Sequence, residues 1–310
     1  MYSKQDQSPR LTRRRFLKVL GGMTVGTAAM GLGGWTYATR IEPGWVETVR
    51  VELTLPRLTP AFDGFRLAQI SDIHLSEAMN GEQLAEACRM VLALQPDMVA
   101  ISGDLIEERH NLRRALSDLL DGLRELTEQV QVVFVMGNHD YWTGAVSIRE
   151  ALKELKIVEL RNDVLTLERE GQRLHAAGVD DAWEGKARLR DVLKKLPDDG
   201  AAFLLAHEPD YADVSARSGR FDLQISGHSH GGQVVLPWVG PPILPFYGRR
   251  YPSGLYHIGT MVQYTNRGLG TTSPHVRLNC RPEVTLFTLR APAVTEAAQP
   301  ARRPAPARLS

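Results

Sequence analysis

Short apolar runs recur along the first half of the chain, and each ends in a group of polar residues. The runs occupy residues 65–71, 99–102 and 132–136, and the segments between them carry apolar residues at helical spacing. This alternation predicts strand–helix–strand units and therefore a parallel sheet. Asp72, Asp104 and Asn138 follow the three runs. They lie 32 and 34 residues apart, about the length of one such unit.

The second half of the chain has a different pattern. Short strands are predicted at residues 157–160, 164–167, 173–178, 202–206, 223–226 and 284–289, and a charged helix at 186–196. An alternating segment at 46–55 precedes the first unit and is typical of an edge strand. The whole pattern predicts an α/β fold followed by short strands with Gly and Pro turns.

Polar residues with metal-binding groups stand at the ends of the predicted strands. Asp72 and His74 are two positions apart, so in extended backbone they point to the same side. Open α/β sheets build their sites at the carboxyl ends of parallel strands, where several such residues meet. The candidate ligands are Asp72, His74, Asp104, Asn138, His207, His228 and His230.

Seven oxygen and nitrogen donors are more than a structural zinc site uses, which closes at four. They suffice for two metals about 3.5–4 Å apart that share one carboxylate, and Asp104 is the natural bridge. Because no thiolate takes part, the set favours Mn²⁺, Zn²⁺ or Fe. Successive side chains in extended backbone point to opposite sides, so Asn138 and His139 are not expected to bind the same metal.

Composition narrows the class of protein. The 310 residues are 43% hydrophobic and 24% charged, enough to bury a large core, and the net charge of +1 gives no field for nucleic acid. Cys88 falls on a helical apolar stripe and is interpreted as a packing residue. A disulfide between Cys88 and Cys280 is an alternative if the domain is exported.

The N-terminal segment has the pattern of an export signal. Arg13 and Arg14 precede Phe-Leu-Lys and an uncharged run over residues 19–39 that contains six glycines, too many for a soluble helix. This resembles the twin-arginine (Tat) signal. The run has 21 residues and lacks an Ala-x-Ala cleavage site, which favours a retained membrane anchor with the domain outside. We therefore expect a signal or anchor over 1–40, a domain over 41–290 and a disordered Ala/Pro/Arg tail over 291–310.

The same residues carry a family resemblance. Asp72-x-His74, Gly103-Asp104, Gly137-Asn138-His139-Asp140, His207 and Gly227-His228-Ser229-His230 resemble, in order and spacing, the motifs of the calcineurin-like metallophosphoesterases. Finer features, among them Asn266-Arg267-Gly268-Leu269-Gly270, resemble a bacterial membrane-associated branch with a twin-arginine signal. That branch is related to the UDP-2,3-diacylglucosamine hydrolases. The resemblance implies a four-layer sandwich of two mixed β-sheets flanked by helices.

The resemblance also implies roles for individual residues. One metal would be bound by Asp72, His74, Asp104 and His230, and the second by Asp104, Asn138, His207 and His228. His139 would lie near the leaving-group oxygen, oriented by Asp140. Arg267 is a candidate phosphate clamp, although a surface arginine is nearly as favoured.

The implied activity is hydrolysis of P–O bonds, by a phosphodiesterase or pyrophosphohydrolase in which the metals activate a bridging water. A lipid-linked substrate such as UDP-2,3-diacylglucosamine is one candidate. The alternatives are a protein or nucleotide phosphatase, and a catalytically silent metal-binding scaffold at the membrane. Besides the phosphoester, the expected partners are the membrane and the Tat translocase. Trp238 and the apolar, proline-rich residues 241–247 are either core or a lip that touches lipid; both interpretations stay open.

Overall fold

The computed structural model describes residues 31–107 and 111–293. The predicted twin-arginine pair, most of the uncharged run and most of the C-terminal tail lie outside this part of the chain. Within the described ranges, no helix combines the length and the apolar character needed to span a bilayer.

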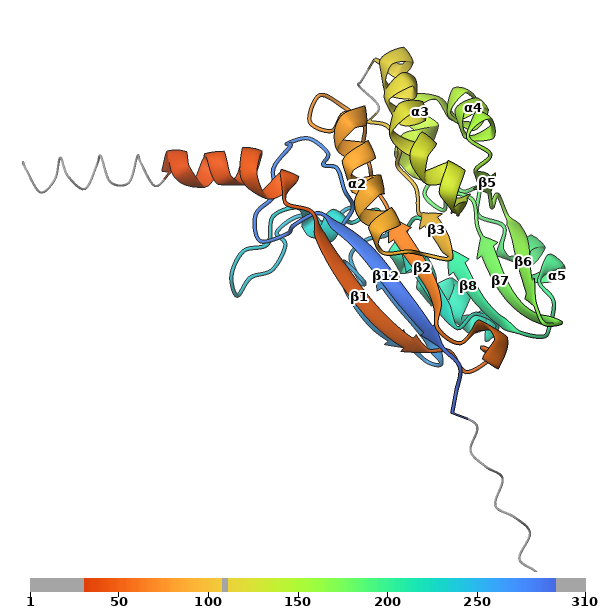
Figure 1. The fold of residues 1–310 in the computed structure, drawn as a ribbon. Coiled ribbons are helices and arrows are strands. Elements are labelled where there is room, and N and C mark those ends of the chain that lie inside the picture. The colour runs from red at the N-terminus through yellow and green to blue at the C-terminus, as the bar shows by residue number, and fades with distance from the viewer. Residues whose placement is uncertain (1–30, 108–110, 294–310) are drawn as a thin grey trace, which may run out of the picture.

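The three strand–helix–strand units form the centre of the first sheet. Its strand order is β1-β12-β2-β3-β4-β5. The strands β2, β3, β4 and β5 run parallel, and β12 pairs antiparallel with β2 and parallel with β1. The alternating segment is therefore an edge strand, as predicted (Figure 1). The bounds are β1 Glu47–Thr54, β2 Phe65–Ile70, β3 Met98–Ile101, β4 Gln131–Phe134, β5 Val158–Glu159 and β12 Glu283–Arg290.

The second sheet collects the remaining strands in the order β10-β11-β9-β8-β7-β6. Its central strands β11, β9, β8 and β7 are parallel, and both edge strands are antiparallel to their neighbours. Both sheets are thus mixed. The bounds are β6 Asp163–Arg169, β7 Gln172–Gly178, β8 Ala201–Leu205, β9 Leu223–Ser226, β10 Gly254–Ile258 and β11 Met261–Thr265.

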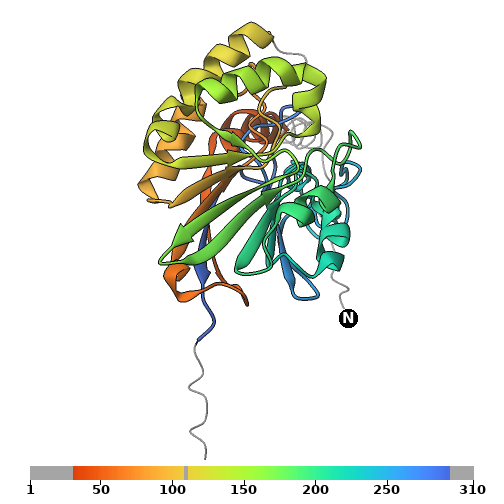
Figure 2. The same cartoon turned by 90° about the vertical axis from the view of Figure 1, so that its right-hand side faces the viewer.

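Alternation along the strands builds the layers. In β2, Leu67 faces the second sheet, whereas Ile70 faces the helices. Phe203 of β8 packs into the same inter-sheet core. Figure 2 shows the two sheets side by side, with helices on the outer face of each. The predicted four-layer sandwich of two mixed sheets flanked by helices is confirmed.

The helices mostly follow the predicted spacing. Asn80 and Asn111 cap α2 and α3 with their side chains, accepting hydrogen bonds from the N3 backbone groups. The charged helix is shorter than predicted. A short helical turn begins at Pro209. The bounds are α2 Gly81–Ala93, α3 Leu112–Gln129, α4 Asn138–Glu154, α5 Leu189–Lys195 and α6 Ala212–Ser215.

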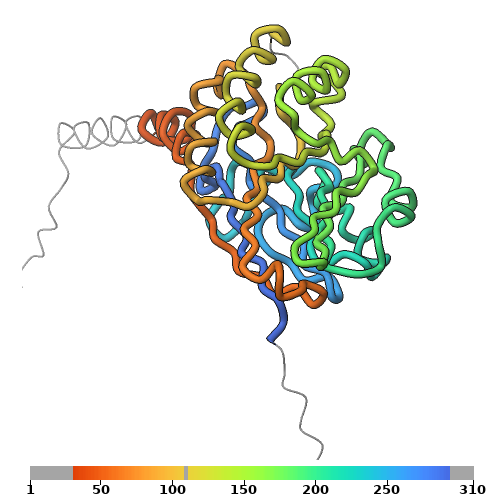
Figure 3. The backbone as a smooth tube through the Cα atoms, turned by 45° about the vertical axis from the view of Figure 1, so that its right-hand side comes forward, coloured from red at the N-terminus to blue at the C-terminus, as the bar shows by residue number. Residues whose placement is uncertain are grey.

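Two features lie outside the sandwich. Residues 31–44 form a helical stalk that leaves the domain at one side, while the chain after β12 leaves at another (Figure 3). A loop over residues 236–246 carries Trp238 and Ile243 in exposed positions, so the core interpretation of this segment is wrong. Cys88 and Cys280 are buried and unpaired, so the alternative of a disulfide between them is wrong.

Candidate metal centre

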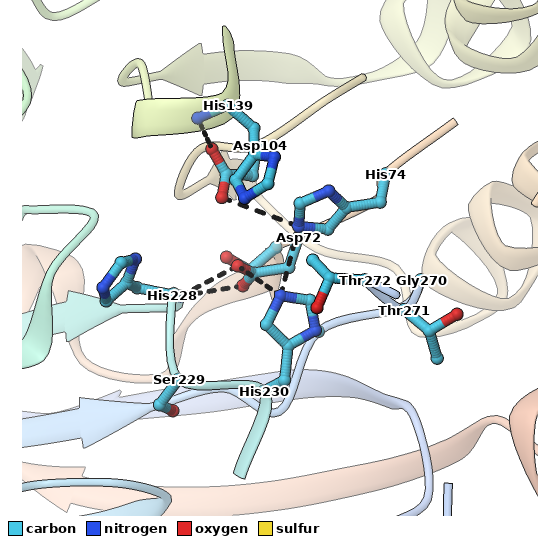
Figure 4. A network of polar contacts seen from close by, with 12 residues as sticks. Asp72, His74, Asp104, His139, His228, Ser229, His230, Gly270, Thr271 and Thr272 are labelled. Carbon is cyan, nitrogen blue, oxygen red and sulfur yellow. Dashed lines mark hydrogen bonds and ion pairs between the residues drawn. The ribbon is translucent and has the colours of Figure 1, made fainter. Parts of the chain in front are cut away.

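All seven candidate ligands meet where strands of both sheets end. Asp72 and His74 follow β2, Asp104 follows β3, and Asn138 begins α4 directly after β4. His207 follows β8, and His228 and His230 follow β9. Figure 4 shows the side chains of Asp72, His74, Asp104 and His230 pointing toward one another, with the backbone N–H of His228 donating to Asp72. The prediction that strand ends assemble one site agrees with this arrangement.

The side chains form two overlapping groups. In one, His230 Nε2 lies 3.1 Å from His74 Nε2 and 3.4 Å from Asp72 Oδ1. In the other, His207 Nε2 lies 3.3 Å from His228 Nδ1. The Oδ2 atom of Asp104 stands between them, 3.0 Å from His207 Nε2 and 3.6 Å from His74 Nε2. Asp104 is therefore placed to be shared by both groups.

A backbone carbonyl orients two of these rings. His207 Nδ1 lies 2.7 Å from the Ser102 carbonyl, and His228 Nε2 lies 2.8 Å from the Phe246 carbonyl. A carbonyl accepts only, so each of these nitrogens carries a proton and the other nitrogen of the ring faces the site. This is the arrangement that metal-binding histidines adopt.

Burial and neighbouring charges set the protonation states. Burial opposes ionisation of Asp104, but His207, His139 and His74 outweigh it and hold the pKa of Asp104 well below its usual range. Burial and the nearby His207 lower the pKa of His228 to about 4. Burial and His74 likewise lower the pKa of His230 well below its usual range. Asp104, His228 and His230 are thus in the ligand forms that divalent metals need, whereas nearby carboxylates raise the pKa values of His74 and His207 against the effect of burial.

An unpaired buried oxygen supports a cation at this place. Among the described residues, Asn138 Oδ1 is buried without a hydrogen-bond partner, a costly condition for a polar atom. Oxygen and imidazole donors at this spacing suit Mn²⁺, Zn²⁺ or Fe.

The backbone around the ligands is strained. Asp72, His74, Asp104, His228 and His230 all have positive φ, between 46° and 69°. Such conformations cost non-glycine residues on the order of 1–3 kcal/mol each and concentrate at functional sites. At Gly227, a Cβ would stand 1.9 Å from Ser71 Oγ and 2.1 Å from Asp72 Oδ2, so this close approach requires glycine.

Asn138 and His139 lie in the first turn of a helix, so the expectation of extended backbone there is wrong. The backbone N–H of His139 donates to Asp104 Oδ1 at 2.9 Å, while its side chain points into the pocket described below. Asp140 also departs from expectation. Its carboxylate accepts hydrogen bonds from the backbone N–H groups of Gly137, Asp104 and Leu105. It therefore fixes the backbone of both ligand loops and does not orient the His139 ring.

Arg267 is already engaged by acidic partners. Its guanidinium pairs with Glu47 and with the buried Glu283, and it lies outside the pocket lining. This geometry does not agree with the prediction that Arg267 clamps a phosphate. Two carboxylates neutralise the arginine, and the three side chains together join β1 to β12. Sequence reasoning missed this because Glu47 and Glu283 are far from Arg267 along the chain.

Two further residues escaped the sequence analysis. Glu107 Oε2 lies 2.8 Å from His74 Nδ1 and 3.8 Å from His139 Nδ1, so it contacts a ligand and a pocket histidine together. Its acidic character three positions after Asp104 was the available signal. The fully buried Arg277 donates to the carbonyls of Arg267, Gly268 and Gly270. That segment in turn donates to the Ser71 and Asp72 carbonyls.

A pocket of about 440 Å³ opens beside the metal-binding side chains. Trp142 and Trp183 stand on one side, in edge-to-face contact with ring centroids 6.0 Å apart. Glu208 holds Trp183 there by accepting hydrogen bonds from the backbone N–H groups of Ala182 and Trp183. The other wall is Val234, Pro242, Ile243, Pro245, Pro274 and Val276. The floor is polar and the walls are mainly apolar.

Comparison with known proteins agrees with this chemistry. Residues 65–232 match the family described as calcineurin-like phosphoesterase. The chain is 34% identical over 285 residues to the uncharacterized metallophosphoesterase YkuE of Bacillus subtilis, covering 91% of this chain and 98% of that protein.

Two more relatives extend the comparison. The phosphodiesterase YaeI of Escherichia coli is 32% identical over 283 residues, covering 90% and 99% of the two chains. A transmembrane protein with metallophosphoesterase domain from Bos taurus is 30% identical, with 92% of this chain and 64% of that protein covered. The chain belongs to the calcineurin-like metallophosphoesterases, a family of hydrolases that act on phosphoric ester bonds.

Proposed function

We propose that this protein is a phosphodiesterase or pyrophosphohydrolase that works with two divalent metal ions on a lipid-linked phosphoester. Asp72, His74, Asp104 and His230 would hold one ion. Asp104, Asn138, His207 and His228 would hold the other. The position of Asp104 Oδ2 between the two groups supports the shared assignment. The name of the phosphodiesterase relative supports diester chemistry.

The protein's own residues complete the reaction. When bound, the two cations supply Lewis-acid activation of the phosphoryl group and of the attacking water. His139 projects into the pocket next to the ligands and would donate a proton to the leaving oxygen, a contribution typically worth ~10²–10⁴-fold. Glu107 would hold the His139 ring and the His74 ring in place. Trp142 and Trp183 line the pocket beside the site.

The apolar walls of the pocket carry the substrate proposal. A small phosphate ester needs only the polar floor, whereas an acyl or prenyl chain requires an apolar surface next to it. Aliphatic and aromatic side chains line both sides of this pocket within reach of the metal-binding groups. Burying the chain of a lipid-linked substrate there would contribute roughly 25 cal/mol for each Å² of apolar surface removed from water.

Anchoring at the membrane is the second part of the proposal. The twin-arginine pattern with Arg13 and Arg14 supports export through the Tat translocase, and the uncharged run after it supports retention in the bilayer. The domain would then face the extracytoplasmic side, where it meets lipid-linked substrates at the membrane surface.

The proposal is tested by turnover of the purified, metal-reconstituted chain. We expect Mn²⁺- or Zn²⁺-dependent hydrolysis of bis(p-nitrophenyl) phosphate, and a higher kcat/KM for UDP-2,3-diacylglucosamine than for the UDP-sugar without acyl chains. Val276→Asn, in the apolar wall, should reduce that acyl preference. Val146→Asn, at an exposed position on α4, is the control and should keep it.

Other outcomes identify the alternatives. Preferential hydrolysis of phosphomonoesters, with no benefit from acyl chains, would make the protein a protein or nucleotide phosphatase. Stoichiometric metal binding without turnover of any ester would make it a silent scaffold.

A further inference from the structure

The loop over residues 236–246 exposes a cluster of large apolar side chains. Trp238 is fully exposed, Val239 is 73% exposed and Ile243 is 79% exposed, with Leu236 and Phe246 partly exposed beside them. Soluble domains rarely leave such clusters in water, and clusters of this kind mark interaction surfaces. This loop is therefore a candidate interaction surface, and its partner has to be identified.

The backbone conformation of the loop directs these side chains outward. Leu236 and Gly240 exchange hydrogen bonds across a tight turn, with N–O distances of 3.0 and 2.9 Å. Trp238 at the tip of this turn has a φ of 63°. A bulky residue in the left-handed region costs folding energy, and a fully exposed indole contributes no core packing in return. The exposure of Trp238 thus serves something other than stability.

Charge favours an anionic partner. Residues 233–252 contain no Asp or Glu. Arg250 is paired with Asp213, so Arg249 is the basic group that this stretch offers to a partner. Arg249 is exposed and lines the same surface hollow as Pro241 and Ile243. A basic group beside a tryptophan and aliphatic side chains is the combination found at the interface of membrane-surface segments.

The stalk and the loop share one supporting segment. The backbone N–H of Arg277 donates to the Ala38 carbonyl of the stalk at 2.8 Å, and the side chain of Glu42 accepts from the N–H of Cys280. One residue further along, the Leu278 carbonyl accepts from the N–H of Val235 at 2.8 Å. Figure 1 shows the loop, in cyan, on the same side of the domain as the stalk, in red. The stalk and the loop therefore leave the domain on the same side and are both hydrogen-bonded to residues 277–280.

We propose that the loop over residues 236–246, with Arg249, docks on an anionic phospholipid bilayer, with Trp238 and Ile243 inserted at headgroup depth. A single protruding turn is small beside the roughly 800 Å² per partner of a stable protein interface, which argues against a second copy as the occupant. Ile243 belongs to both the loop and the pocket wall, so docking brings the mouth of the pocket to the lipid surface. The proposal stands whatever the substrate is.

The buried cysteines permit a position-specific test in the full chain. Val239→Cys places an accessible thiol on the loop, whereas Cys88 and Cys280 are protected. Val146→Cys, at a 70% exposed position on α4, is the matched control. Each variant is labelled with an environment-sensitive fluorophore. Each is then mixed with vesicles of phosphatidylcholine, with or without phosphatidylglycerol. Brominated lipids report the depth of the label.

We expect emission from position 239 to rise about twofold or more with phosphatidylglycerol vesicles and to be quenched by brominated lipid, while position 146 does not respond. Adding Arg249→Gln should weaken the response to phosphatidylglycerol.

Three results would overturn the proposal. One is an unresponsive label at 239 on protein that nevertheless sediments with vesicles through its N-terminal segment. Another is an equal response at both positions. The third is a response at 239 to protein concentration without vesicles, which would indicate self-association. Hydrolysis of bis(p-nitrophenyl) phosphate in solution is unaffected by any of these results, so the catalytic proposal is judged separately.

Discussion

The carboxylate of Glu107 lies 2.8 Å from Nδ1 of His74. The contact orients the ring so that Nε2 faces Asp104 and His230. It also draws the pKa of His74 upward against the effect of burial, because a carboxylate in contact with the ring favours the imidazolium. A carboxylate behind a ligand histidine fixes the ring and strengthens it as a metal ligand.

Replacing Glu107 should therefore weaken metal binding without unfolding the domain. We expect Glu107→Ala to lower metal affinity by roughly 10–100-fold, as loss of an outer carboxylate typically does. Isothermal titration of the chelated protein with Mn²⁺ measures this. Glu86→Gln, at an exposed position on α2, is the control and should bind as the unmodified protein does. Unchanged affinity in Glu107→Ala would show that the contact is incidental.

Asp104→Asn tests the shared ligand. An amide cannot balance two dications, so this variant should lose detectable hydrolysis and retain at most one tightly bound ion. Elemental analysis after gel filtration gives the stoichiometry, and circular dichroism checks that the fold is kept. Two tightly bound ions with normal turnover would contradict the bridging role.

Much of this site could be predicted because its residues follow a local sequence pattern that repeats along the chain. Apolar runs followed by Asp72, Asp104 and Asn138 imply parallel strands, and parallel strands place their carboxyl ends at one edge. His207 and His228 follow runs of the same kind in the second sheet. What sequence could not supply was the long-range pairing. Arg267 meets Glu47 and Glu283 only because β1 and β12 are neighbours.

Local conformation was the other gap. Gly137-Asn138-His139 follows an apolar strand and was interpreted as its continuation, yet the backbone turns into α4 at Asn138. The capping carboxylate of Asp140, three positions after Gly137, was the signal for a helix start. The sequence could not decide between the two interpretations of the loop around Trp238 for a different reason. Its composition suits a core as well as a lipid surface, and only the exposure of its side chains excludes the core.

His139→Ala separates binding from catalysis. The variant should keep both metals, because the other ligands remain, while turnover falls by ~10²-fold or more as the leaving oxygen loses its proton donor. The loss should be smallest for aryl esters, whose leaving groups need little protonation, and largest for alkyl or sugar phosphoesters. Loss of metal, or an equal loss on both ester types, would remove His139 from the proposed role.

Metal binding should release protons. Burial opposes protonation of His207, but the adjacent Asp104 carboxylate outweighs it and raises the pKa of His207 well above its usual range. The metal-free protein therefore carries a proton on His207 near neutral pH, and a metal must displace it. Affinity should rise with pH until the pH exceeds the pKa of His207. Calorimetry in two buffers of different ionisation enthalpy counts the protons; a count of zero at pH 7 would contradict the assignment.

A buried carboxyl pair beneath Trp183 links stability to pH. Burial, reinforced by the nearby Glu208 carboxylate, raises the pKa of Asp181 to about 9, whereas an unfolded chain would titrate near 3.8. Between these values the folded state binds the extra proton, so stability must fall as the pH rises from about 4 to about 9. Asp181→Asn keeps an acceptor for the N–H of Glu184 and removes the titrating group. We expect this variant to be more stable than the unmodified metal-free protein at pH 8, by about 2 kcal/mol or more, and to show a flatter pH dependence of stability.

Asp191→Asn, at an exposed position on α5, is the control and should change neither the stability nor its pH dependence. Urea unfolding at pH 5 and pH 8 checks this, and an identical pH dependence in Asp181→Asn and the unmodified protein would show that Asp181 is ionised in the fold.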